Sequence, residues 1–106
     1  MAACKLAPVH PGEMLREEFM KPLGLTISEV ARRLRVPPNR ISQLVQRKRA
    51  MTADTALRLS QYFGMSADFW MNLQSAYELD LARQQSGKAI KRIPKRSQIA
   101  EPRPAA

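Results

Sequence analysis

Apolar residues recur at helical spacing in five successive stretches of the chain. The first helix is expected to begin at Pro11, because a proline loses no hydrogen bond in a first helical turn. It is expected to end at the breakers Pro22 and Gly24. Its apolar face would carry Met14, Leu15 and Phe19.

The next two helices are separated by a short turn rich in proline. Thr26 and Glu29 have the spacing of a capping box, which predicts a second helix from there to about Leu34. Val36 precedes two prolines and is expected to be extended, because a residue before proline avoids the helical region. Pro38 then opens a third helix, at about 38–46. The expected inward residues of the two helices are Ile27, Val30, Ala31, Leu34, Ile41, Leu44 and Val45.

Two further helices follow, and a tail without apolar periodicity ends the chain. Thr52 is expected to cap a fourth helix that Gly64 ends, and Ser66 opens a fifth that fades near 84–88. The expected inward faces hold Ala56, Leu59, Ser60 and Phe63, then Phe69, Leu73, Ala76, Tyr77 and Leu81. The sequence therefore predicts an all-α fold, with a basic, largely disordered tail at 87–106 and an extension at 1–9.

The charge of the chain points to a polyanionic partner. The 106 residues carry a net charge of +9, and the excess is local. Seven cations and no acid lie between Arg32 and Arg49, where a solvated helical face would mix both signs. Two short helices joined by a tight turn, the second polar and basic outside, are typical of a helix-turn-helix that binds double-stranded DNA.

The third helix supplies side chains that suit base edges, and its surroundings supply cations that suit phosphates. Amide and guanidinium groups on the first turns of a helix in the major groove pair bidentately with bases. The expected base-reading residues are Asn39, Arg40, Ser42, Gln43 and Gln46. The expected phosphate-binding residues are Thr26, Arg33, Arg47, Lys48 and Arg49.

The fifth helix has more apolar surface than one small domain needs, which predicts a homodimer on an inverted-repeat operator. Phe69 is expected to lie in the core, so Trp70, one residue on, would point about 100° away toward a subunit interface. The expected interface residues are Trp70, Leu73, Tyr77 and Leu81.

Little in the sequence suits an enzyme. The one histidine, His10, precedes "PGE" and is expected to be a helix-entry residue, and the one cysteine, Cys4, excludes an intrachain disulfide. No cluster has metal-ligand spacing and no glycine-rich phosphate loop is present, so neither a catalytic residue nor a metal or other cofactor is expected. No apolar run suits a membrane span or a signal peptide, which favours a cytoplasmic, nucleoid-associated protein.

Residues 10–74 closely resemble the HigA- and VapI-type antitoxins of bacterial type II toxin–antitoxin modules, within the phage-repressor-like helix-turn-helix class. The segments "HPGE", "GLT", "VPPNRI", "TADTALRL" and "FWMNLQ" carry this resemblance. It implies a dimer that binds an operator and represses its own operon, and a small mRNA-cleaving toxin as partner. The five predicted helices give the expected phage-repressor-like DNA-binding domain the bounds 10–86.

The chain departs from that family pattern in the turn, and two questions stay open. Arg35 stands where glycine is usual, at a cost of up to about 1 kcal/mol if its backbone is left-handed. Pro37 replaces a capping residue. A solitary regulator without a toxin is the alternative function, and the tail could clasp DNA, fold onto a partner or keep the protein soluble.

Overall fold

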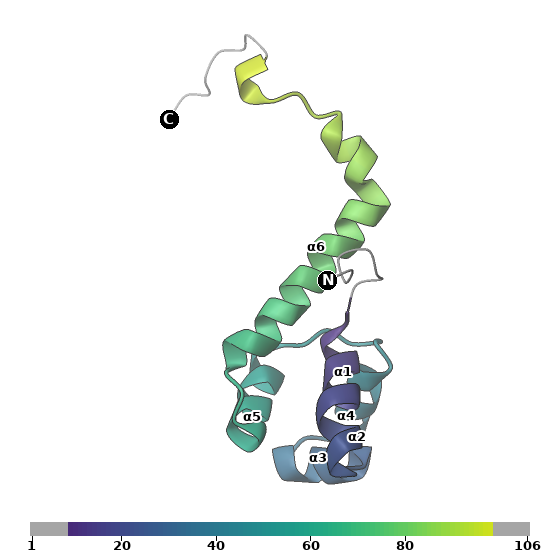
Figure 1. The fold of residues 1–106 in the computed structure, drawn as a ribbon, viewed down its shortest axis with the longest axis vertical. Coiled ribbons are helices and arrows are strands. Elements are labelled where there is room, and N and C mark those ends of the chain that lie inside the picture. Colours follow the sequence, from purple (N-terminus) through teal and green to yellow (C-terminus); the bar gives the residue numbers. More distant parts are fainter. Residues whose placement is uncertain (1–8, 99–106) are drawn as a thin grey trace.

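The computed structural model describes residues 9–98, and within them the fold is helical (Figure 1). Helix-forming stretches lie where the apolar periodicity predicted them, so the all-α expectation is confirmed. The elements are α1 (Pro11–Met14), η2 (Leu15–Met20), α2 (Lys21–Leu23), α3 (Ile27–Leu34), α4 (Pro38–Val45), α5 (Ala53–Phe63), α6 (Ala67–Lys91) and η3 (Arg96–Gln98). Cys4 and the tail residues 99–106 lie outside the described part of the chain.

The first helical segment begins as expected, with His10 as its N-cap and Pro11 in its first turn. The His10 Nδ1 atom accepts a hydrogen bond of 2.9 Å from the Gly12 N–H, which confirms His10 as a helix-entry residue. The middle of the segment is a π-helix, which the sequence did not predict. Its wider turn lets Leu15 and Met20, five residues apart, both face the core.

The helix-turn-helix consists of α3, the turn after it and α4. The capping box of Thr26 and Glu29 is present, with hydrogen bonds of 2.9 and 3.1 Å in the two directions. Arg35 has a left-handed backbone with φ of 59°, at the position where a glycine would be free of strain. Pro37 is extended and caps α4 without a side-chain hydrogen bond, and Pro38 begins the helix as predicted.

Helices α5 and α6 are joined by a short turn and pack against each other, and α6 is longer than expected. Thr52 and Gly64 bound α5 as predicted. The expected end of the last helix near 84–88 is wrong, because α6 continues for 25 residues to Lys91, about 37 Å at 1.5 Å per residue. Only its first half lies against the other helices, and the rest projects away from them (Figure 1). Residues 87–91, assigned to the disordered tail, are therefore helical.

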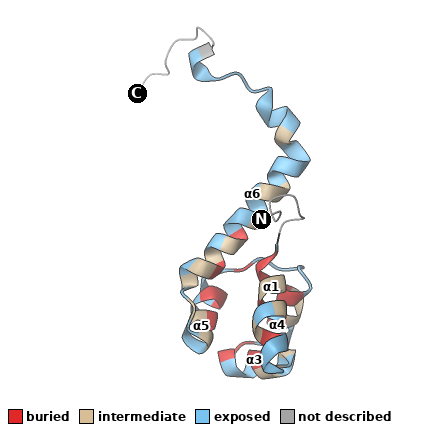
Figure 2. Ribbon diagram, in the orientation of Figure 1, coloured by how far each residue is buried: buried red, intermediate tan, exposed pale blue. Residues whose placement is uncertain are grey.

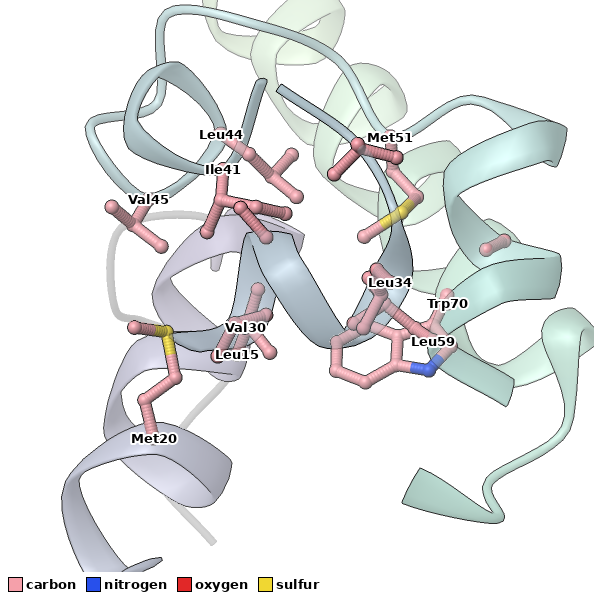
Figure 3. Close-up of a cluster of buried hydrophobic side chains, with 13 residues drawn as sticks. Leu15, Met20, Val30, Leu34, Ile41, Leu44, Val45, Met51, Leu59 and Trp70 are labelled. Atoms are coloured by element: carbon pink, nitrogen blue, oxygen red, sulfur yellow. The ribbon is translucent and has the colours of Figure 1, made fainter. Parts of the chain in front are cut away.

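A single core lies between α1, η2, α3, α4, α5 and the first half of α6, which together form the body of the molecule. The projecting half of α6 is largely exposed (Figure 2). The inward faces of α3 and α4 are as predicted, since Val30, Leu34, Ile41 and Leu44 are buried. Figure 3 shows these side chains converging with residues from the other helices of the body.

The orientation expected for Trp70 is wrong. Its side chain is fully buried, while its neighbour Phe69 is only partly so. The Trp70 ring lies 5.2 Å from that of Phe19 and 5.1 Å from that of Phe69, centroid to centroid. Trp70, Gln74 and Tyr77 form the inward line of α6, and the polar Gln74 within it hides that line from a hydrophobic pattern. Trp70 is therefore a core residue and is not available to a subunit interface.

Two contacts fix α4 against the rest of the body. Gly12 lies so close to the end of α4 that an added Cβ would overlap the backbone carbonyl of Leu44. The Gln74 Oε1 atom accepts a hydrogen bond of 2.7 Å from the Met51 N–H, in the segment that follows α4. These contacts hold both ends of the 46–51 connection, which carries the cations Arg47, Lys48 and Arg49.

Candidate nucleic-acid interface

Helix α4 presents one polar face to solvent, opposite its buried Ile41 and Leu44. At 100° per residue, Asn39, Gln43 and Gln46 lie nearest the centre of this face, and all three are at least partly exposed. Ser42 lies at one edge of the face and Arg40 at the other. The structure thus places four of the five expected base-reading residues on α4 and the fifth, Gln46, at its C-cap.

Hydrogen bonds on this face orient its side chains. The Gln46 Nε2 atom donates to the Ser42 Oγ atom at 3.0 Å. The Arg49 guanidinium donates twice to the Gln43 Oε1 atom, at 3.1 and 2.7 Å. Gln43 therefore keeps its amide N–H groups for another acceptor, because its oxygen is already occupied. Asn39 stands exposed in the first turn of α4.

Arg40 is held by the neighbouring helix. Its Nη1 atom donates to the Asp54 Oδ2 atom at 2.7 Å, and its side chain is 29% exposed. The same carboxylate oxygen accepts from the Arg58 Nε atom at 2.9 Å. These two hydrogen bonds, with that from Arg40 the larger cause, hold the pKa of Asp54 below 3.8, so the carboxylate stays ionised at neutral pH.

The basic loop after α4 lies beside this face. Arg47 has a left-handed backbone with φ of 62°, and its guanidinium lies 3.7 Å from the Glu13 carboxylate. Lys48 and Arg49 are exposed. All three cations therefore lie at the C-terminal end of α4, where a backbone phosphate next to a groove-bound helix would be within reach.

The other two expected phosphate-binding residues lie on α3. Thr26 is exposed at the N-terminus of that helix, where backbone N–H groups favour an anion. Arg33 lies in the last turn of α3 and lines a hollow of about 450 Å³ with Arg58, Gln61 and Tyr62. Thr26 and Arg33 therefore occupy opposite ends of α3.

His10 joins the start of the chain to this region, a role that reaches beyond helix entry. Its ring packs edge-on against Tyr77 with the centroids 4.8 Å apart. Burial lowers the pKa of His10, and the positive charge of Arg47 lowers it further. The backbone of Arg49 and the charge of Glu13 act in the opposite direction. The neutral ring is thus the form that fits beside the basic loop.

Sequence reasoning missed three residues that shape the site. Asp54 accepts hydrogen bonds from both Arg40 and Arg58, and Gln74 holds the segment after α4. A signal for the first two was available, because Asp54 is the one acid between Arg32 and Arg58 and the two lie four residues apart on one helix. Of the expected interface residues, Leu73, Tyr77 and Leu81 are partly exposed along α6.

Within residues 9–98, no three His, Cys, Asp or Glu side chains are grouped to hold a metal ion. None of the helices described there has the length and apolarity that a membrane crossing requires.

Comparison with known proteins gives consistent matches. A helix-turn-helix family model matches residues 17–70. The chain is 50% identical over 80 residues to virulence-associated protein I of Dichelobacter nodosus, covering 76% of this chain and 74% of that protein. It is 37% identical over 79 residues to antitoxin HigA-1 of Vibrio cholerae, covering 74% of each chain. The solved structure of Pseudomonas aeruginosa antitoxin HigA with the higBA promoter matches with a TM-score of 0.80 and 42% identity. That match covers 84% of this chain and 97% of the other.

Proposed function

Since the chain belongs to the helix-turn-helix family, among the HigA- and VapI-type antitoxins, we propose that it is a sequence-specific DNA-binding repressor and antitoxin. The observation that carries this proposal is the exposed polar face of α4, which is flanked by the 47–49 cations and packed on the helical core. A face of amides and hydroxyls suits base edges, and the cations beside it suit phosphates.

The proposed mode of binding places α4 in the major groove. Asn39 and Gln43 read base edges from the centre of the face, with Ser42 and Gln46 in support. Arg47, Lys48 and Arg49 bind phosphates beyond the end of the helix, and Thr26 binds one at the N-terminus of α3. Arg40 reads a base from the edge of the face, within the limits that Asp54 sets on its side chain.

A homodimer on an inverted repeat completes the proposal. A single α4 covers few base pairs, whereas two copies about 34–36 Å apart would read two half-sites. The projecting half of α6 supports association, because Leu79 and Ile90 are each 51% exposed there and Leu81 is only partly covered. Tyr77 and Leu73 lie nearer the body on the same helix.

The test of the repressor function is a binding titration on the DNA upstream of the gene. The protein should prefer that DNA over a shuffled duplex of the same composition by a factor of at least about 10³ at physiological salt. Equal affinity for the two duplexes would contradict the proposal.

The antitoxin function has a separate test. A small basic protein encoded beside the gene should co-purify with this chain when the two are expressed together, and the chain should relieve its toxicity. A chain that binds its operator but retains no neighbouring product would instead be a solitary regulator. Such a regulator, too, would act as a binding protein of the bacterial nucleoid and not as an enzyme.

A further inference from the structure

Asp54 occupies an unusual place in the charge distribution. It is the one acid between Arg32 and Arg58, a stretch that holds eight cations. Its Oδ2 atom accepts from Arg40 at 2.7 Å and from Arg58 at 2.9 Å, while its side chain remains 58% exposed. One carboxylate therefore engages two of the guanidinium groups next to the proposed DNA-binding face.

Arg58 extends this network to the turn of the helix-turn-helix. Its Nη1 atom donates to the carbonyl oxygen of Leu34 at 2.8 Å and to that of Arg35 at 3.3 Å. Carbonyls at the end of a helix lack partners within the helix, so Arg58 satisfies acceptors that would otherwise depend on water. Through Asp54, the end of α3, the first turn of α4 and the start of α5 are joined by hydrogen bonds.

We infer that Asp54 is a specificity-determining positioning residue, which holds Arg40 and Arg58 away from indiscriminate phosphate contacts and fixes the first turn of α4. The inference rests on the proposed DNA-binding function. Asp54 acts through the two arginines, and its own carboxylate binds no base.

The physical basis is the difference between the two kinds of DNA binding. Non-specific affinity rises with the number of phosphates that cations neutralise, whatever the sequence. Specific affinity depends on the placement of side chains against base edges. A free Arg40 or Arg58 would add to non-specific affinity. An Arg40 that is fixed at the edge of α4 contributes to specific affinity instead. The carboxylate thus lowers random binding and preserves operator binding.

The experiment compares Asp54→Asn with Asp68→Asn on the operator and on a shuffled duplex. The two aspartates are matched, because each is the second residue of its helix, after a Thr or Ser N-cap. Each substitution removes one negative charge. Asp54→Asn should raise affinity for the shuffled duplex by about 3–10-fold at 0.1 M salt and steepen its salt slope by about 1–2. The operator-to-shuffled ratio should fall by about tenfold or more. Asp68→Asn should leave that ratio within about twofold of wild type.

Two further variants separate positioning from a general effect of charge or folding. Asp54→Glu keeps the charge, so its salt slope on shuffled DNA should match wild type. In a background that carries both Arg40→Ala and Arg58→Ala, Asp54→Asn should change the operator-to-shuffled ratio by less than about threefold, because both side chains through which Asp54 acts are gone. Thermal unfolding of each variant, followed by Trp70 fluorescence, confirms that the compared proteins are folded at the temperature of the titration.

The outcomes distinguish this inference from the proposed function. A wild-type protein that does not prefer its operator would end the proposed function itself. A wild type with strong preference, and an Asp54→Asn variant whose ratio equals that of Asp68→Asn, would overturn the positioning role alone. The positioning role is likewise overturned if Asp54→Asn has its full effect in the absence of the Arg40 and Arg58 side chains.

Discussion

The guanidinium of Arg40 in α4 and the carboxylate of Asp54 in α5 meet at 2.7 Å. The sequence predicted that Arg40 reads a base, and it gave no partner for the side chain. The structure shows it bonded to a neighbouring helix and only 29% exposed. Contact between Arg40 and a base is therefore left to the guanidinium nitrogens other than Nη1, which Asp54 engages.

This pairing makes a prediction about the titration of Asp54. Because a hydrogen bond from Arg40 is the first cause of its lowered pKa, Arg40→Ala should raise the pKa of Asp54 toward 3.8. The rise should be incomplete, since Arg58 still donates to the carboxylate. NMR titration of the carboxyl carbon measures both values. An unchanged pKa in the variant would show that the pairing does not persist in solution.

A second prediction concerns the close approach of α1 and α4. Gly12→Ala should destabilise the fold by about 1–3 kcal/mol or more, because its Cβ would overlap the Leu44 carbonyl and backbone cannot shift cheaply. Gly87→Ala is the control: no atom lies within 4 Å of the added Cβ, and alanine in a helix should stabilise by about 0.5–1 kcal/mol. Urea unfolding followed by Trp70 fluorescence gives both changes, and similar effects of the two variants would refute the packing.

A third prediction uses the two arginines with left-handed backbone, Arg35 at φ 59° and Arg47 at φ 62°. Glycine relieves the strain at either position, so each replacement should stabilise the protein by about 0.5–1 kcal/mol. Only Arg47→Gly should also weaken DNA binding, with the salt slope falling by about 0.9 for the lost phosphate contact. Equal losses of DNA affinity for Arg35→Gly and Arg47→Gly would disprove the separate roles of the two arginines.

A fourth prediction concerns pH. The pKa of the one histidine, His10, is lower in the folded protein than its usual 6.5, so the unfolded chain binds protons more readily. Its contribution to stability is therefore complete above about pH 6.5 and declines as the pH falls through the folded pKa. His10→Asn keeps an N-cap acceptor for Gly12 and should flatten this decline. Unfolding free energies at about pH 7.5 and 5.5 measure it, and an equal decline in both proteins would exclude His10 as its source.

Local signals predicted most of the fold. Thr26 and Glu29, Pro38, Thr52 and Gly64 each fix a helix boundary through one hydrogen bond or one backbone angle, and such chemistry is visible in the sequence. The inward residues of α3 and α4 were likewise predictable from periodicity alone.

The errors arose where tertiary contacts decide. In the π-helix, Leu15 and Met20 are both buried in one core, a tertiary contact that no local rule reveals. Trp70 was misplaced because Gln74, a polar residue, occupies the inward line of α6 to bond Met51. Within the site, the polar face of α4 could be predicted from the sequence. The hydrogen bond between Asp54 and Arg40 could not, because it depends on how α4 and α5 pack.

The central claim is that α4 reads bases while the loop after it binds phosphate. Its most direct test titrates wild type, Asn39→Ala and Lys48→Ala against the operator, single-base-pair variants of it and shuffled DNA, at several salt concentrations. Asn39→Ala should lose about 1–3 kcal/mol on the operator, tolerate change at one base pair per half-site and keep its salt slope. Lys48→Ala should weaken every duplex alike and reduce the slope by about one. Equal weakening of operator and shuffled DNA by Asn39→Ala would contradict the placement of α4 in the groove.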